Sequence, residues 1–172
     1  VDNKNRFYVV IPTGRKYFIW FTCLNNKPVC VSLSYVFKTK MIQQVKIIKC
    51  NFDPVLTLGN GTILYGTHVM LKKHNLFSIE NIFYYKNKRV LFETQYIKFS
   101  ILQQILSSYI SNKIYLNNEY LFKIPIINTS HRSILSKLKK LPYNVYCIQH
   151  RSWIDNEYLN EKINIEMNQK AV

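Results

Sequence analysis

The first third of the chain alternates apolar and polar positions with the short period of β-strands. Three segments are rich in β-branched and aromatic residues, and polar turns separate them; they cover residues 6–12, 16–24 and 28–36. We expect these segments to form an antiparallel meander, with a fourth strand over residues 43–50. The next stretch, 53–62, contains one proline and two glycines, which predict a connection.

Residues 64–88 have the pattern of a β-hairpin with basic residues at both ends. An apolar strand runs into a turn that contains Lys72 and Lys73, and a second apolar strand follows. The second strand ends among three further cations, Lys86, Lys88 and Arg89. Glu80 is the only acidic residue of this segment. The hairpin therefore offers positive charge at its two ends and a single carboxylate between them.

The hydrophobic period then changes to that of helices. Apolar residues in 94–110 recur at helical spacing, and Thr94 is a candidate N-cap. A second, shorter and basic helix is expected over 130–141. Strands are expected on either side of it, over 120–127 and 144–150.

Together these elements predict an α+β fold, in which two or three helices pack on one strongly twisted antiparallel sheet. We expect a basic domain over residues 1–151. The tail, 152–172, is polar and mildly acidic and is expected to be helical. We expect this tail to lead into a further part of a longer polypeptide.

Charge is distributed unevenly along the chain. The 172 residues carry a formal net charge of +15, and the tail has four acidic residues against two lysines, which leaves +17 for the rest. A body of this charge favours polyanionic partners, namely nucleic acid or the acidic surface of another protein. The alternative is that the lysines serve solubility and reflect AT-rich coding, since Lys, Asn, Ile and Tyr are all abundant.

Several classes of protein are disfavoured by the same sequence. No apolar run approaches the 18 residues of a membrane span, and 48% of the residues are hydrophobic, as in a folded chain. The four cysteines form no C-x-x-C pair, which favours free thiols in a reducing intracellular compartment. The four histidines lack the spacing of metal ligands. We therefore expect neither a metal nor another cofactor.

Two segments resemble the nucleotidyltransferase-like fold of mRNA capping enzymes and of the snurportin cap-binding domain. The first, YVVIPTGRKYFIWF (8–21), is similar to the snurportin-like V-V-x-P-x-G-[KR]-[KR] pattern. In the second, Leu64-Tyr65-Gly66 and the run 81–87 stand where that fold has the two strands of its catalytic hairpin. The helix over 94–110 also has a counterpart there. The resemblance covers about residues 6–110 and implies that fold.

The departures from the family pattern concern catalysis. The family's lysine nucleophile lies in K-x-D-G, which is absent here; Lys38-Thr39-Lys40-Met41 lacks both the acid and the glycine. Tyr65-Gly66-Thr67 replaces the acidic hairpin motif, and Asn81 stands in place of the second strand's aspartate. The resemblance thus implies a fold that has kept binding and lost catalysis, so we expect no enzyme activity.

The resemblance also places Tyr85 where the snurportin-like pattern has a base-stacking tryptophan. The alternative is that Tyr85 is a core or cross-strand aromatic, as strand aromatics commonly are. The candidate nucleotide- or RNA-binding residues are Tyr85, Tyr65, Arg15, Lys16, Lys72, Lys73, Lys86, Lys88 and Arg89. They form one phosphate-binding face if the fold brings them together, and an ordinary solvated surface if it does not.

Three functions remain open from the sequence. The first is a non-catalytic domain that binds RNA, in preference to DNA, or a cap-like nucleotide. The second is a structural role in a large assembly, such as a minor capsid or virion-assembly protein, and an AT-rich large DNA virus would fit the composition. The third, an active mRNA guanylyltransferase, is disfavoured by the missing nucleophile.

Overall fold

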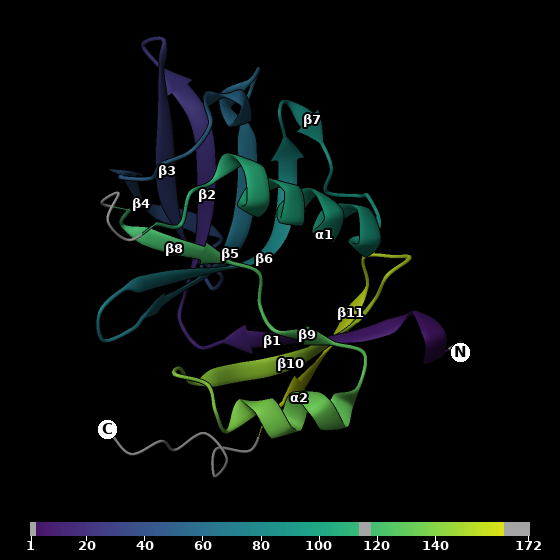
Figure 1. Cartoon of the computed structure of the whole chain (residues 1–172). Coiled ribbons are helices and arrows are strands. Elements are labelled where there is room, and N and C mark those ends of the chain that lie inside the picture. Colours follow the sequence, from purple (N-terminus) through teal and green to yellow (C-terminus); the bar gives the residue numbers. More distant parts are fainter. Residues whose placement is uncertain (1–2, 114–117, 164–172) are drawn as a thin grey trace.

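The computed structural model describes residues 3–113 and 118–163, and its strands form two sheets (Figure 1). The larger is a seven-stranded sheet in the order β4-β3-β2-β5-β6-β7, with β8 paired in parallel to β6. Its strands are β2 (Arg15–Leu24), β3 (Lys27–Val36), β4 (Met41–Ile48), β5 (Thr62–Met70), β6 (Asn75–Tyr85), β7 (Lys88–Arg89) and β8 (Tyr120–Lys123). The fold class is α+β, as the pattern predicted.

The smaller sheet has four strands in the order β11-β10-β1-β9. They are β1 (Arg6–Pro12), β9 (Ile127–Asn128), β10 (Val145–Ser152) and β11 (Tyr158–Lys162). The prediction of one sheet, opened by a meander of the first three strands, was wrong in this respect. The chain leaves β1 through the turn at Thr13 and Gly14 and enters the other sheet, so β1 pairs with β10 and β9 instead of β2.

The tail was also predicted incorrectly where the structure describes it. Residues 158–162 form β11, which pairs with β10 from Cys147 to Arg151, and they are not helical. An edge strand exposed on both faces needs no apolar alternation, which is why the polar segment gave no strand signal. Residues 164–172 lie outside the described ranges.

Two helices pack on these sheets, one on each. Helix α1 (Gln95–Gln104), capped by Thr94, continues into a wider turn, η3 (Ile105–Tyr109), and covers one face of the large sheet (Figure 1). Helix α2 (His131–Leu138), capped by Ser130, packs on the small sheet. Two 3₁₀ turns, η1 (Asn3–Asn5) and η2 (Pro54–Thr57), complete the described elements. Neither α1 nor α2 is long and apolar enough to cross a bilayer.

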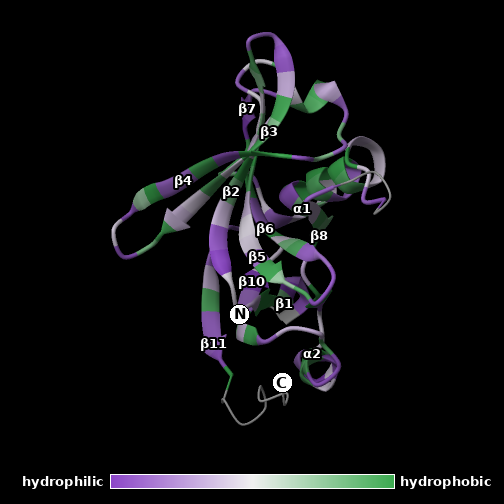
Figure 2. Cartoon of the chain, turned by 90° about the vertical axis from the view of Figure 1, so that its left-hand side faces the viewer, coloured by the Kyte–Doolittle hydropathy of each residue, from purple (hydrophilic) through white to green (hydrophobic). Residues whose placement is uncertain are grey.

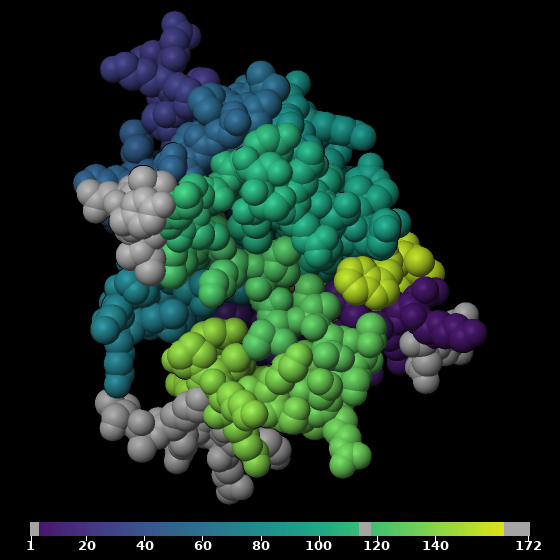
Figure 3. Space-filling model, in the orientation of Figure 1, coloured from purple at the N-terminus to yellow at the C-terminus, as the bar shows by residue number. Residues whose placement is uncertain are grey.

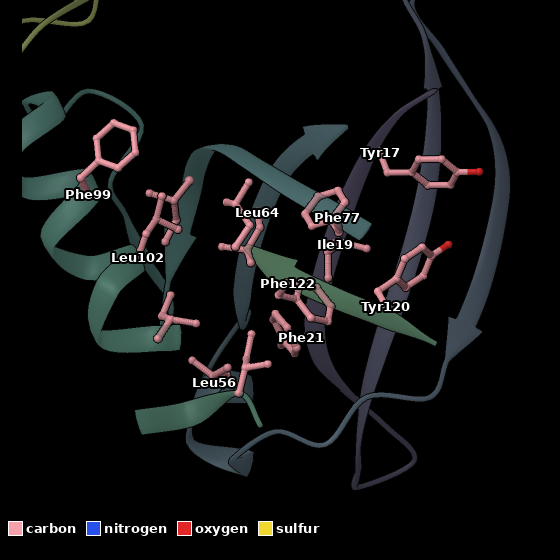
Figure 4. Close-up of a cluster of buried hydrophobic side chains, with 14 of the residues drawn as sticks. Tyr17, Ile19, Phe21, Leu56, Leu64, Phe77, Phe99, Leu102, Tyr120 and Phe122 are labelled. Atoms are coloured by element: carbon pink, nitrogen blue, oxygen red, sulfur yellow. The ribbon is translucent and has the colours of Figure 1, made fainter. Parts of the chain in front are cut away.

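The main core lies between α1 and the large sheet (Figure 4). Ile19 and Phe21 of β2 meet Leu102 of α1 and Phe122 of β8 there, all of them fully buried. A second, smaller core joins α2 to the small sheet through Val10, Ile134, Leu138 and Ile148. Each sheet therefore has one face packed against a helix. The other face of the small sheet, which includes Phe7 and Val9, is buried in the main core, so within the described residues only the large sheet has a face open to partners.

Candidate nucleic-acid interface

The face of the large sheet opposite α1 carries a continuous group of aromatic rings. We call it the aromatic face; its members are Phe18, Tyr35, Phe37, Tyr65 and Phe83. Phe18 lies at the centre, with ring centroids 5.7 Å from Tyr35, 5.1 Å from Tyr65 and 5.3 Å from Phe83. Phe37 extends the group at 5.2 Å from Tyr35. The rings meet at steep angles, the edge-to-face arrangement that aromatic pairs prefer.

Strand alternation explains why these rings point away from the core. On β2, Tyr17 and Ile19 are buried in the main core, so Phe18 between them must point to the other side. Tyr65 is directly opposite Phe18 in the ladder and shares its face. On β6 the register slips by one residue: Tyr84 pairs with Ile63 and Ile82 with Leu64, which leaves Phe83 as the extra residue of a bulge.

The rings differ in how far they are open to solvent. Phe37, just beyond β3, is 61% exposed, whereas the other four are half-buried by one another. Burial, reinforced by the nearby Glu80 carboxylate, raises the pKa of Tyr65 well above its usual value, so its hydroxyl stays neutral. Phe37 is therefore the ring most available to a stacking partner, and the others form the surface around it.

Cations border the aromatic face at the β2 end. A hollow of about 910 Å³ is lined by Arg15 and Lys38 together with Tyr35 and Phe37. Arg15 and Lys38 are both exposed. The hollow thus joins two aromatic rings to two positive charges, the combination that suits a base with its phosphate.

A second hollow adjoins the first and shares Arg15 with it. This one, of about 930 Å³, lies between the β5–β6 hairpin and residues 141–144, and Figure 3 shows it at the left of the molecule. Lys72 and His68 line it. Burial lowers the pKa of His68, so the imidazole is neutral near pH 7 and the positive charge comes from Arg15 and Lys72.

Lys16 is closely held by other side chains. Its Nζ lies 2.6 Å from Glu80 Oε1 and 2.6 Å from Thr67 Oγ1, and Thr67 in turn donates to Glu80 Oε2 at 2.6 Å. The side chain of Glu80 is 5% exposed and that of Lys16 is 18% exposed. The charge of Lys16 is therefore already neutralised within the fold, although its stem borders the hollow at Arg15.

Tyr85 lies on the other side of the sheet from Tyr65. Its ring packs against the main core, and its hydroxyl donates to Gln104 Oε1 of α1 at 3.4 Å. The ammonium of Lys86 lies 5.0 Å from the centre of the same ring and 3.1 Å from the Tyr109 hydroxyl. Part of the ring is buried and part is covered by this cation, so Tyr85 is not an open stacking platform in this structure.

The remaining predicted cations lie at two separate ends of the hairpin. Lys88 and Arg89 are exposed on β7, and Arg89 lies 4.7 Å above the ring of Phe92. Lys73 faces the polar surface around Glu119, away from Lys72. The structure thus brings Tyr65, Arg15, Lys16 and Lys72 into one region and leaves Tyr85, Lys73, Lys86, Lys88 and Arg89 outside it. Of the two arrangements that the sequence left open, these five residues do not join the others on one face.

Sequence reasoning missed most of the aromatic face. Phe18 and Phe83 read as ordinary strand residues, and Phe37 reads as the end of a strand. Lys38 entered only as part of a failed match to a nucleophile motif. Strand alternation offered a usable signal: Phe18 lies between Tyr17 and Ile19, and if those two face the core, Phe18 must face outward. No protein-family model and no curated protein matches the chain, so these assignments rest on its own geometry.

Proposed function

We propose that the chain is a non-catalytic domain that binds single-stranded RNA across its aromatic face. The observation that supports this best is the open ring of Phe37 in contact with Tyr35, beside the cations Arg15 and Lys38. Sheets that bind single strands use outward aromatics for bases and nearby cations for phosphates. The excess positive charge of the chain favours the same class of partner.

The two adjoining hollows suggest the course of the strand. Arg15 borders both, with Lys38 on one side and Lys72 on the other. Phosphates placed along Lys38, Arg15 and Lys72 would leave bases directed at Tyr35 and Phe37. A cap-like nucleotide is the shortest ligand that this arrangement could hold, because it offers one base and a charged phosphate chain.

The ion pair formed by Glu80, the acidic residue of the hairpin, favours binding over nucleotidyl transfer. Glu80 forms an ion pair with Lys16 and is largely buried, so it is engaged in the fold. Lys38 has no neighbouring aspartate in the chain, and the K-x-D-G motif is absent. Transfer chemistry needs an activated lysine and carboxylates that hold a metal, and the sequence offers neither arrangement at this face.

The test is fluorescence anisotropy with short single-stranded RNAs, capped and uncapped, over a range of salt concentrations. We expect binding at low salt that weakens with a logarithmic slope of about −0.7 for each phosphate contacted. Replacing both Arg15 and Lys38 with Ala should make that slope shallower. Lys88→Ala with Arg89→Ala is the matched control, since it removes the same charge outside the aromatic face. Absence of binding to every RNA at low salt would refute the proposal.

A specific observation also favours a structural role in an assembly. Strand β4 is an edge of the large sheet and exposes Met41, Ile42, Val45 and Ile47 by 50–63%. Figure 2 shows β4 projecting from the molecule together with the end of β3, with which it is paired. Val45 is opposite Leu33 and shares its face with Phe18. An exposed, apolar edge of this kind pairs readily with the strand of a neighbouring subunit.

Sedimentation of the protein at increasing concentration separates this second candidate from the first. If β4 is an assembly edge, the wild-type chain associates and Val45→Lys remains monomeric. Val45 shares its face with Phe18, so Val45→Lys adds a positive charge near the aromatic face and should keep RNA binding or strengthen it while it blocks association. A wild-type chain that stays monomeric at every concentration and binds RNA supports the first candidate alone.

A further inference from the structure

Three metal-ligating side chains meet on the α2 side of the small sheet. His131 is the first residue of α2, His150 lies on β10 and Glu161 lies on β11. The Nε2 atoms of both histidines lie 2.7 Å from the same carboxylate oxygen, Glu161 Oε2. Taking one possible ligand atom from each residue, the three atoms all lie within 4.8 Å of one another.

The fold holds these three side chains in place independently of one another. His150 is paired with Tyr8 of β1, and Glu161 is paired with the buried Ile148 of β10. The start of α2 is fixed by the Ser130 cap, and Ile134 in its next turn is fully buried on the sheet. The backbone positions of the three residues are thus fixed by a helix terminus and two adjacent strands, and only their side chains can adjust.

Tyr8 orients both imidazoles. Its ring centroid lies 5.1 Å from that of His131 and 4.9 Å from that of His150, with steep interplanar angles. Edge contacts of this kind restrict the rotation of each histidine ring. Restricting the rings keeps their nitrogens directed at the same point, which is the role that outer neighbours have in known metal sites.

We propose that His131, His150 and Glu161 form a binding site for one Zn²⁺ ion. Two imidazole nitrogens and one carboxylate oxygen are the three protein ligands of many open zinc sites, whose fourth position is taken by water. The three side chains are 32–37% exposed, which leaves one side of the site accessible to that water. None of the functions considered above accounts for this cluster.

The geometry needs only a small adjustment to accept the ion. Donor atoms around a tetrahedral Zn²⁺ lie about 3.3 Å apart, given bonds of roughly 2.0–2.1 Å. The two N···O distances are 2.7 Å, so the donors must separate by about 0.6 Å, which side-chain rotation can supply. Each histidine must then carry its proton on Nδ1, so that Nε2 has a free lone pair.

Spacing along the chain concealed this site: the expectation of no metal was based on histidines without metal-ligand spacing and without a matching acidic cluster. His131 and His150 are separated from Glu161 by 30 and 11 positions. Glu161 was assigned to a helical tail, and it reaches the histidines only because that segment forms β11. The site exists through the pairing of β11 with β10, which the sequence pattern did not indicate.

The test is titration of the untagged chain, freed of metal by a chelator, with Zn²⁺ followed by calorimetry. We expect one ion for each chain, and at least about tenfold weaker binding by His131→Ala and by His150→Ala. His74→Ala is the matched control, because His74 lies in the β5–β6 turn away from the cluster. With Co²⁺ in place of Zn²⁺, the wild type should show the visible absorption of a four-coordinate site.

Circular dichroism distinguishes loss of the site from loss of the fold. Should either alanine variant fail to fold, Glu161→Gln keeps the size of the side chain and removes the ligating charge. We expect it to fold and to bind Zn²⁺ more weakly. Bound Zn²⁺ should also raise the melting temperature of the wild type and not that of this variant. Failure of the wild type to bind Zn²⁺, or equal binding by folded His131→Ala, would overturn the proposal.

Discussion

The ammonium of Lys16 lies 2.6 Å from the carboxylate of Glu80, and the pair is enclosed where the two sheets meet. Thr67 completes the arrangement by contacting both partners. From β10 of the small sheet, Arg151 donates to the backbone carbonyl of Glu80 at 2.9 Å. The carboxylate of Glu80 thus joins β2, β5 and β6 within the large sheet, and its backbone carbonyl links β6 to the small sheet.

Removing that carboxylate should destabilise the fold strongly. Glu80→Ala leaves the largely buried Lys16 ammonium without its partner, and breaking a buried pair in this way costs about 3–5 kcal/mol. Urea unfolding of wild type and variant measures the difference. The control is Lys46→Ala, which breaks the exposed pair with Glu119 at 3.5 Å and should cost less than about 1 kcal/mol. Equal losses in the two variants would contradict the structural role given to Glu80.

The open ring of the aromatic face provides the sharpest test of the RNA proposal. Phe37→Ala should weaken RNA binding by about 1–3 kcal/mol, the usual contribution of one stacked base. Because Phe37 is 61% exposed, its loss should change the free energy of unfolding little. Tyr96→Ala is the matched control: Tyr96 is 69% exposed but lies on α1, on the other side of the sheet. If both variants weaken RNA binding equally, the aromatic face is not the site.

Tyr85 should respond in the opposite way. Tyr85→Ala removes a ring packed against the main core, and its partial exposure places the loss near 2 kcal/mol, below the roughly 3–5 kcal/mol of fully buried aromatics. RNA affinity should stay at the wild-type level. Tyr85→Phe removes the hydroxyl, with its 3.4 Å hydrogen bond to Gln104 and its interactions with Lys86 and Tyr109, and should cost much less than loss of the ring. Thermal melts run beside RNA titrations separate these outcomes. If Tyr85→Ala is as stable as the wild type but binds RNA more weakly, Tyr85 is a base-stacking residue after all.

Most individual helices and strands were predictable because the apolar positions in their sequence pattern are the positions that the fold buries. Thr94 was expected as an N-cap, and its side chain accepts a hydrogen bond from the helix that it opens. Ser130, at the start of the expected second helix, does the same. Residue alternation likewise located the strands of the hairpin. Such signals depend on the neighbours of a residue in sequence, which the pattern contains in full.

The arrangement of the strands and the candidate sites were not predictable in the same way. Nothing local distinguishes a β1 that pairs with β2 from one that pairs with β10, since both partners are apolar strands. The bulge at Phe83 reverses the alternation near the end of β6, and this puts Tyr85 on the core side. The face on which Tyr85 lies therefore depended on one inserted residue that the hydrophobic pattern does not reveal.

The last prediction concerns Lys98, a buried lysine on α1. It is 2% exposed, and its Nζ donates to Asn156 Oδ1 at 2.7 Å. Burial, together with the nearby charge of Arg151, lowers the pKa of Lys98 to about 8. In the unfolded chain the same ammonium has its ordinary value near 10.4. Between these two values the unfolded chain binds more protons than the folded one, so raising the pH through this window favours the folded state.

Lys98→Met keeps the length of the side chain and removes the titrating group. The free energy of unfolding of the wild type, relative to Lys98→Met, should therefore rise from pH 8 to pH 10 and be lowest and level below pH 7. Urea unfolding at each pH gives this difference, and the comparison cancels the tyrosines and cysteines that titrate in the same range. Lys137→Met, on α2, is the control and should show no such trend. A difference that falls with rising pH would mean that the Lys98 ammonium is stabilised in the fold, contrary to the effect of its burial.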